Sequence, residues 1–234
     1  MQLNLTNIRY SYAGSPREVL RGVTVSLHTG WTGVVGDNGC GKSTLARIAT
    51  GELRPTSGSV EPAGLVAAYC EQDSERPPAA LLDFAAAWDR NAVRLRDVLG
   101  IGDDWAWRFD ELSSGQQKRL QVAAALWSRP GVLVMDEPTN HLDARTRQAV
   151  LLALRPFSGV GILISHDRDL LDALVERCIS FESGEVRVRP GNYSHTFEQR
   201  QRESAAAADA QARARREERR LAAERQRRVE AASR

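Results

Sequence analysis

The stretch Gly36-Asp37-Asn38-Gly39-Cys40-Gly41-Lys42-Ser43 decides the fold of this chain. It matches the pattern GxxxxGK[ST], in which glycines let the backbone turn tightly so that successive N–H groups point at a phosphate chain. In that pattern Lys42 reaches the β- and γ-phosphates of a nucleotide, and the Ser43 hydroxyl binds Mg²⁺. The residues expected to hold the nucleotide here are Gly36, Asp37, Asn38, Gly39, Cys40, Gly41, Lys42, Ser43 and Thr44.

The residues before this phosphate loop are those expected of a strand, and the residues after it are those expected of a helix. The apolar stretch 32–35 is predicted to form a buried strand, and residues 45–48 are predicted to open a helix. The N-terminus of that helix would add partial positive charge to the site. The alternative is a glycine-rich turn that binds nothing, but a complete motif between a strand and a helix favours phosphate binding.

Composition excludes several classes of protein. The chain has 234 residues, 42% hydrophobic and 26% charged, which suits one globular domain with an appendage. No apolar run approaches the roughly 18 residues of a membrane-spanning helix, and the N-terminus does not resemble a signal peptide. Cys40, Cys70 and Cys178 are too scattered for a disulfide framework or a zinc site. These features predict a cytoplasmic protein.

Two near-continuous apolar runs, at residues 132–135 and 160–164, are separated by a predicted helix at 144–154. This alternation is typical of a parallel sheet that is covered on both faces. Ligands of such sheets bind at the carboxyl ends of the strands. The polar side chains expected there are those of Asp136, Glu137 and His166.

These three side chains suit a nucleotide that carries Mg²⁺. Asp136 follows an apolar strand, which would give a magnesium-holding carboxylate a rigid mount. Glu137 is a candidate general base for a water that attacks the γ-phosphate. His166 could contact the same phosphate from the neighbouring strand. A single histidine at a strand end is more often structural, but three polar groups beside a phosphate loop favour catalytic roles for Glu137 and His166.

Residues 1–197 are expected to form the nucleotide-binding domain, with two subdomains. Residues 1–27 contain β-formers around turns and are predicted to form antiparallel strands. Residues 77–129 have apolar side chains at helical spacings and are predicted to form a small helical subdomain. Trp105 and Trp107 are expected to pack in its core.

Residues 198–234 form a tail of alanine, arginine, glutamate and glutamine, which are helix formers. The tail has eleven basic and seven acidic residues, a local excess of four positive charges. Glutamates precede arginines by four residues at Glu198/Arg202, Glu224/Arg228 and Glu230/Arg234, the favourable order for a helix. The tail is therefore predicted to be helical, either as a solvated helix or as an arm that lies against a partner such as RNA.

Further motifs resemble those of ATP-binding-cassette ATPases. Residues 112–116, LSSGQ, resemble the signature loop of that family and precede a helical stretch at 117–126. Residues 132–143, VLVMDEPTNHLD, resemble its second nucleotide motif followed by its D-loop. Gln72 matches the Q-loop of the family, His166 its switch histidine and Tyr12 its adenine-stacking aromatic residue.

This resemblance implies a fold and two cofactors. The fold is an α/β P-loop cassette with a mostly parallel core sheet, an antiparallel β subdomain, a small helical subdomain and a charged C-terminal helix. The cofactors are ATP and Mg²⁺. The metal would be held by Ser43, Gln72 and Asp136.

The resemblance also implies a second cassette. Two cassettes of the family form a head-to-tail sandwich, in which each ATP lies between the phosphate loop of one and the signature loop of the other. In this chain Ser113, Ser114, Gly115 and Gln116 would face the ATP of the partner, and Asp143 would belong to the D-loop. Ser114 stands where the family usually has glycine.

A narrower resemblance is to the F subfamily, whose members act on ribosomes. It rests on residues 140–143 (NHLD), 165–168 (SHDR) and 191–194 (GNYS) followed by a charged helix. The chain is similar to the N-terminal cassette of that subfamily with the start of its interdomain linker, which reaches towards tRNA. The short stretch between Gln72 and Leu112 resembles the antibiotic-resistance members, which protect ribosomes. The expected function is thus a cytoplasmic ATPase that acts on the ribosome.

The chain departs from the subfamily in having one phosphate loop, because F-type proteins normally carry two cassettes. It could pair with a second copy or with a missing C-terminal half, and as an isolated cassette it is expected to hydrolyse ATP weakly. Two alternatives stay open. One is the ATP-binding, energy-coupling subunit of a membrane transporter, and the other is a half-length fragment that binds ATP without turnover.

Overall fold

The computed structural model describes residues 1–140, 142–182 and 185–232. The chain divides into two compact units, Met1–Tyr193 and a second that begins at Ser194. The sequence had predicted this boundary at residues 197 and 198.

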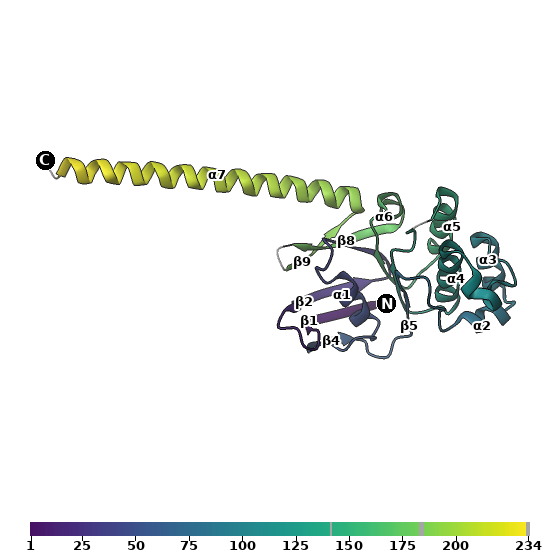
Figure 1. Cartoon of the computed structure of the whole chain (residues 1–234). Coiled ribbons are helices and arrows are strands. Elements are labelled where there is room, and N and C mark those ends of the chain that lie inside the picture. The colour runs from purple at the N-terminus through teal and green to yellow at the C-terminus, as the bar shows by residue number, and fades with distance from the viewer. Residues whose placement is uncertain (141, 183–184, 233–234) are drawn as a thin grey trace. The chain divides into compact units, whose positions relative to one another are not determined.

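A six-stranded sheet forms the centre of the first unit (Figure 1). Its strands, in spatial order, are β5 (Ala67–Cys70), β6 (Val132–Asp136), β7 (Val160–Ile164), β3 (Gly30–Val35), β8 (Val175–Glu182) and β9 (Glu185–Pro190). Neighbouring strands are parallel from β5 to β8, and β9 pairs antiparallel with β8. The carboxyl ends of β3, β6 and β7 therefore lie at the same edge of the sheet.

Both faces of this sheet are buried, which explains the near-continuous apolar runs of its strands. Side chains alternate between the faces of a strand. In β6, Val132 and Val134 pack into one hydrophobic core, and Leu133 and Met135 pack into the other. All four side chains are fully buried.

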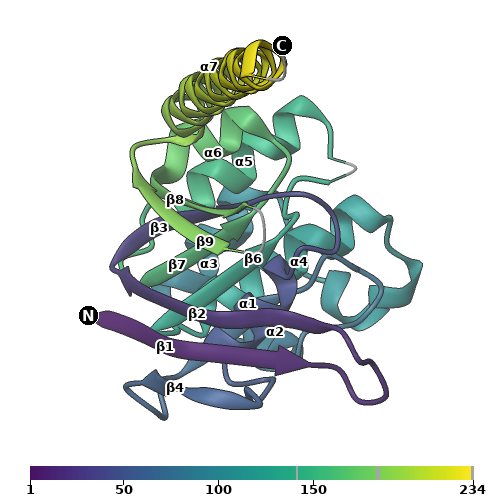
Figure 2. The same cartoon turned by 90° about the vertical axis from the view of Figure 1, so that its left-hand side faces the viewer.

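The first core lies between the central sheet, helix α1 and a second sheet (Figure 2). This second sheet has three antiparallel strands, in the order β2 (Glu18–His28), β1 (Gln2–Ser11) and β4 (Ser57–Glu61). Helix α1 (Lys42–Ala49) follows the phosphate loop and contributes Leu45 and Ile48 to this core. The predicted antiparallel subdomain thus covers the face of α1 that the central sheet leaves open.

Helices cover the other face of the central sheet, on the side away from β1, β2 and β4 (Figure 1). They are α2 (Leu81–Ala86), α3 (Arg90–Leu99), the 3₁₀ helix η1 (Trp105–Glu111), α4 (Ser114–Trp127), α5 (Ala144–Leu154) and α6 (Arg168–Leu174). The elements from α2 to α4 fall within the stretch 77–129. The predicted fold class, including the small helical subdomain, is confirmed.

The prediction for Trp107 is wrong, because its side chain is 69% exposed, whereas Trp105 is 9% exposed and packs in the core. Residues two apart lie on different sides of either kind of helix, about 200° apart in an α-helix and about 240° apart in the 3₁₀ helix η1, so the two indoles could not both face the core.

Two predicted helices begin earlier than expected. Helix α1 begins at Lys42 rather than at residue 45, and α4 begins at Ser114 rather than at residue 117. In both cases the motif that precedes the helix also supplies its first turn.

Helix α7 (Tyr193–Ala232) contains the described part of the charged tail, and Arg234 of the predicted pair Glu230/Arg234 lies outside the described residues. Within it, Arg202 lies 3.5 Å from Glu198 in the predicted i,i+4 ion pair, and Gln199 donates to Glu203 at 3.0 Å. Across the described part of the chain, no helix combines the length and the apolar character needed to cross a membrane.

Candidate nucleotide-binding site

The predicted site residues follow three neighbouring strands of the central sheet. The phosphate loop follows β3, Asp136 ends β6, and His166 comes two residues after the end of β7. Strand β7 lies between the other two, and both pair with it in parallel. The strand order therefore brings the ends of these segments together at one edge, where parallel sheets bind ligands.

Gly41 fixes the geometry at the end of the phosphate loop. Its φ is +112°, a conformation that residues with a side chain rarely adopt. A Cβ atom there would also lie 2.9 Å from Leu20 Cδ2. Gly41 is the N-cap of α1, so the first N–H groups of that helix face the loop and can bind an anion.

The ammonium of Lys42 lies within the same loop. It donates to the carbonyl oxygens of Gly36 at 2.8 Å and Asp37 at 3.0 Å. Because an ammonium has three donors, these two bonds hold the lysine over the loop and leave a donor for a phosphate oxygen.

Ser43 and Asp136 lie where a hard cation could bind. The Ser43 hydroxyl donates to Asp136 Oδ2 at 2.9 Å, and both residues line a cavity together with Gln72. Hydroxyl, carboxylate and amide oxygens are the ligands that Mg²⁺ prefers. The three predicted metal ligands therefore fit the ion by their chemistry and by their place in one cavity.

Glu137 is held in an unusual backbone conformation. Its φ is +48°, in the left-handed region that is uncommon for a residue other than glycine. Its N–H donates to the Ile164 carbonyl at 2.8 Å, and its carboxylate accepts from the backbone N–H of His166 at 3.3 Å. Strain of this kind often occurs at functional sites, where the surroundings fix the side chain.

The carboxylate of Glu137 lies beside the imidazole of His166, with 3.6 Å between Oε1 and Nε2. Burial raises the pKa of the Glu137 carboxyl above its ordinary value, while the N–H and the charge of His166 oppose this shift. A carboxylate with a raised pKa is a better proton acceptor, which suits a general base.

One cavity of about 530 Å³ brings most of the predicted residues together. Those that line it are Tyr12, Asn38, Gly39, Gly41, Lys42, Ser43, Thr44, Gln72, Asp136, Glu137 and His166. Tyr12 is half-exposed, and its hydroxyl lies 3.0 Å from Thr44 Oγ1. Gly36, Asp37, Cys40, Asp143 and the signature loop do not line this cavity, and their roles stay predictions.

The signature loop forms the N-terminus of α4. Ser113 is the N-cap, where its hydroxyl accepts from the Gln116 N–H at 3.4 Å, and Gln116 Oε1 accepts from the Ser113 N–H at 2.9 Å. This reciprocal capping box satisfies the backbone N–H groups of Ser113 and Gln116, and it places Ser114 and Gly115 in the first turn of α4. Asp143 caps α5 in a similar way, accepting from the Thr146 N–H at 2.7 Å. His141, between the two motifs, lies outside the described residues.

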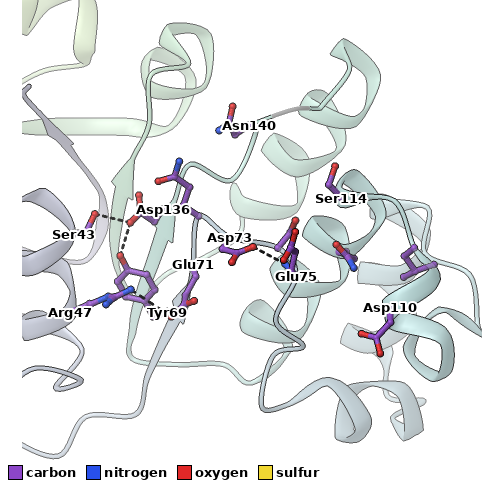
Figure 3. A pocket seen from close by; sticks show the side chains of 14 residues that line it. Ser43, Arg47, Tyr69, Glu71, Asp73, Glu75, Asp110, Ser114, Asp136 and Asn140 are labelled. Atoms are coloured by element: carbon purple, nitrogen blue, oxygen red, sulfur yellow. Dashed lines mark hydrogen bonds and ion pairs between the residues drawn. The ribbon is translucent and has the colours of Figure 1, made fainter. Parts of the chain in front are cut away.

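A larger cavity of about 980 Å³ adjoins the first and shares Ser43, Gln72, Asp136 and Asn140 with it (Figure 3). Its lining includes Tyr69, whose hydroxyl donates to Asp136 at 2.6 Å. Sequence reasoning missed both Tyr69 and Asn140. The signal for Tyr69 was a polar hydroxyl in a short strand that ends two residues before Gln72.

The sequence model of a known protein family matches a stretch that includes the phosphate loop, the signature loop and the strand that carries Asp136. The sequence model of the family described as "ABC transporter" matches residues 20–140, more than half of the chain. This chain belongs to the ATP-binding-cassette family. The family resemblance that the sequence motifs predicted is thereby confirmed.

Relatives of the cassette support the narrower resemblance as well. The probable ATP-binding protein YheS of Haemophilus influenzae is 37% identical over 180 residues, which cover 71% of this chain and 28% of YheS. The ribosome protection protein VmlR of Bacillus subtilis is 32% identical over 199 residues, 82% of this chain and 33% of VmlR. These relatives confirm the resemblance to the F subfamily.

The cassette spans a third or less of the length of YheS and VmlR. It covers 77% of a putative ABC transporter ATP-binding protein of Nitratidesulfovibrio vulgaris, with 34% identity over 212 residues. Among solved structures, the dimeric cassette MJ0796 bound to ADP and Pi has the same fold, with a TM-score of 0.67 and 21% identity. The match covers 80% of this chain and 98% of MJ0796.

Proposed function

We propose that this cassette binds ATP with Mg²⁺, hydrolyses it in a head-to-tail pair of cassettes and acts on the ribosome. The observation that carries the nucleotide part is the 530 Å³ cavity, which gathers Lys42, Ser43, Asp136, Glu137 and His166 at the ends of neighbouring strands. Membership of the ATP-binding-cassette family implies ATP hydrolysis in general. The similarity to a ribosome protection protein supports the ribosomal part.

The first step is binding of the triphosphate. The N–H groups of the loop and of the first turn of α1 would surround the phosphates, and Lys42 would place its charge beside the β- and γ-phosphates. Ser43, Asp136 and Gln72 would hold Mg²⁺, which neutralises the charge that develops during phosphoryl transfer. Tyr12, at the mouth of the cavity, would stack on the adenine.

The second step is attack by water. Glu137 would accept the proton of the water as it attacks the γ-phosphate, because its buried carboxylate is a stronger base than an ordinary glutamate. The bond between the γ-phosphorus and the β–γ bridging oxygen breaks in the same step, and ADP leaves with that oxygen. His166 would hold the γ-phosphate with its imidazole and fix the Glu137 carboxylate with its backbone N–H. These two residues are therefore the proposed catalytic pair.

A complete site would need a second cassette. Ser113, Gly115 and Gln116 of the signature loop line neither of the two adjoining cavities, and Leu112 and Ser114 line only the larger one, at the exposed N-terminus of α4. Ser113, Ser114, Gly115 and Gln116 could therefore serve the ATP of a partner, as the dimeric form of MJ0796 suggests for the family fold. The partner would be a second copy of this chain or a C-terminal half.

The ribosome would be the target. VmlR is named for ribosome protection, so an antibiotic-resistance role in the cytoplasm is proposed for this chain too. The basic residues of the tail would contact RNA phosphates of the ribosome or of tRNA, since residues 198–234 contain almost no large apolar side chain to offer another partner.

The relative from Nitratidesulfovibrio vulgaris favours a second candidate, the energy-coupling subunit of a transporter. That function predicts binding to membrane domains rather than to ribosomes. A third candidate is a half-length cassette that binds ATP without turnover. Measuring turnover beside nucleotide binding separates the third candidate from the other two.

Removing the segment after Ser194 should weaken ribosome binding and leave ATP binding unchanged. All nucleotide motifs lie before this point, whereas contacts between arginine and phosphate release counterions and weaken steeply with salt. The measurement is a pair of ribosome titrations, with the full chain and with the truncated chain, at several salt concentrations. The truncated chain should have a lower affinity and a flatter salt dependence.

ATP affinity, measured on both proteins by calorimetry, is the control for folding. Superimposable ribosome titrations would mean that α7 does not contact RNA. If the full chain did not bind ribosomes at any salt concentration, the ribosomal function itself would be wrong.

A further inference from the structure

Tyr69 reaches the proposed metal site from the neighbouring strand. Strand β5 pairs with β6, and Tyr69 lies opposite Val134 in their register. From there the phenol hydroxyl lies 2.6 Å from Asp136 Oδ2 (Figure 3). This is a short hydrogen bond to a carboxylate that is itself buried, with 5% of its residue surface exposed.

The same carboxylate oxygen also accepts the hydrogen bond from Ser43 at 2.9 Å. A carboxylate oxygen offers about two lone-pair directions, so Oδ2 of Asp136 is occupied by these two donors. The other oxygen, Oδ1, is then the one available to the metal or to a water bound to it. Without the Tyr69 hydroxyl, the carboxylate would have one described side-chain donor and more freedom to rotate.

The ring of Tyr69 is fixed as well. The guanidinium of Arg47 lies over it, 5.6 Å from the ring centroid, and Arg47 also pairs with Glu71 at 3.7 Å and with Glu52 at 4.0 Å. A carboxylate can only accept hydrogen bonds, so the Tyr69 phenol is the donor in its bond to Asp136.

We propose that Tyr69 is a positioning residue for the metal site, whose hydroxyl fixes the Asp136 carboxylate so that Oδ1 faces Mg²⁺. The inference rests on the proposed nucleotide function. A role in packing alone would need only the ring, which phenylalanine also supplies. Packing alone therefore does not account for the hydroxyl.

Tyr69→Phe separates these two roles, because it removes the hydroxyl and keeps the ring. The measurement is calorimetric binding of ATP by the full chain, in EDTA and at a series of Mg²⁺ concentrations. Loss of a hydrogen bond to a metal ligand typically weakens metal affinity 10–100-fold, and we expect about a 10-fold rise in the Mg²⁺ concentration at half effect. ATP affinity in EDTA should not change.

Tyr193→Phe is the matched control, because it makes the same substitution outside the cavity and keeps the ring that lies 5.8 Å from Arg168. An unchanged Mg²⁺ titration for Tyr69→Phe would overturn the inference. Equal losses of ATP affinity with and without Mg²⁺ would also overturn it, because they would indicate general damage to the site. If the unmodified chain bound no ATP, the proposed function would be wrong.

Discussion

Lys42→Ala should abolish ATP binding. The ammonium binds two carbonyls of the phosphate loop, and Lys42 lines the proposed nucleotide cavity. Hydrogen bonds to charged groups are worth about 1.5–3 kcal/mol each, so loss of the contact to phosphate together with the two bonds that hold the loop should weaken binding by roughly 100-fold or more. Calorimetry with ATP and Mg²⁺ on the full chain measures this directly.

Arg155→Ala is a suitable control for the loss of one positive charge, because Arg155 is exposed at the end of α5. Its ATP affinity should equal that of the unmodified chain. If Lys42→Ala bound ATP as tightly as this control, the phosphate loop would not hold the nucleotide as proposed.

Glu137→Gln should keep ATP binding and suppress hydrolysis. The amide has nearly the shape of the carboxylate but cannot accept the proton of the attacking water. General bases contribute typically 10²–10⁴-fold, so the steady-state rate should fall by roughly 100-fold or more. The measurement compares phosphate release with ATP affinity for the two proteins, at concentrations high enough for cassettes to pair.

Unhydrolysed ATP should also trap the pair of cassettes. Sedimentation of Glu137→Gln at high protein concentration, with saturating ATP and Mg²⁺, should detect a dimer that disappears without nucleotide. A normal hydrolysis rate would exclude Glu137 as the base. A variant that stayed monomeric would exclude pairing of two copies, and a different second cassette would then be required.

Local sequence patterns correctly predicted helices and strands whose structure depends mainly on the residues within them. The run at 160–164 coincides with β7, and the stretch at 144–154 coincides with α5. The apolar side chains of β7 lie on both faces of the strand, and those of α5 recur at helical spacings. In both elements they pack into cores that the same segment helps to form. The capping pattern from Ser113 to Gln116 was also present in the sequence, and it marks the true start of α4 at Ser114.

Contacts between segments could not be read from such patterns. The bond from Tyr69 to Asp136 depends on β5 lying beside β6, and the contact of Glu137 with His166 depends on β6 lying beside β7. The sequence predicted a parallel sheet with His166 on the strand next to that of Glu137, but it did not predict that β5 lies beside β6. Trp107 was misplaced for a different reason, because it lies two residues from the buried Trp105 in η1, so its side chain points to another side of the helix.

Sedimentation of ribosomes tests the central claim, that this cassette acts on the ribosome in an ATP-dependent way. Glu137→Gln with ATP and Mg²⁺ should pellet with ribosomes, and the same protein without nucleotide should stay largely in the supernatant. Lys42→Ala with ATP should also stay there, because it cannot hold the nucleotide. Equal amounts of all three in the ribosome pellet, or none of Glu137→Gln with ATP, would contradict the account.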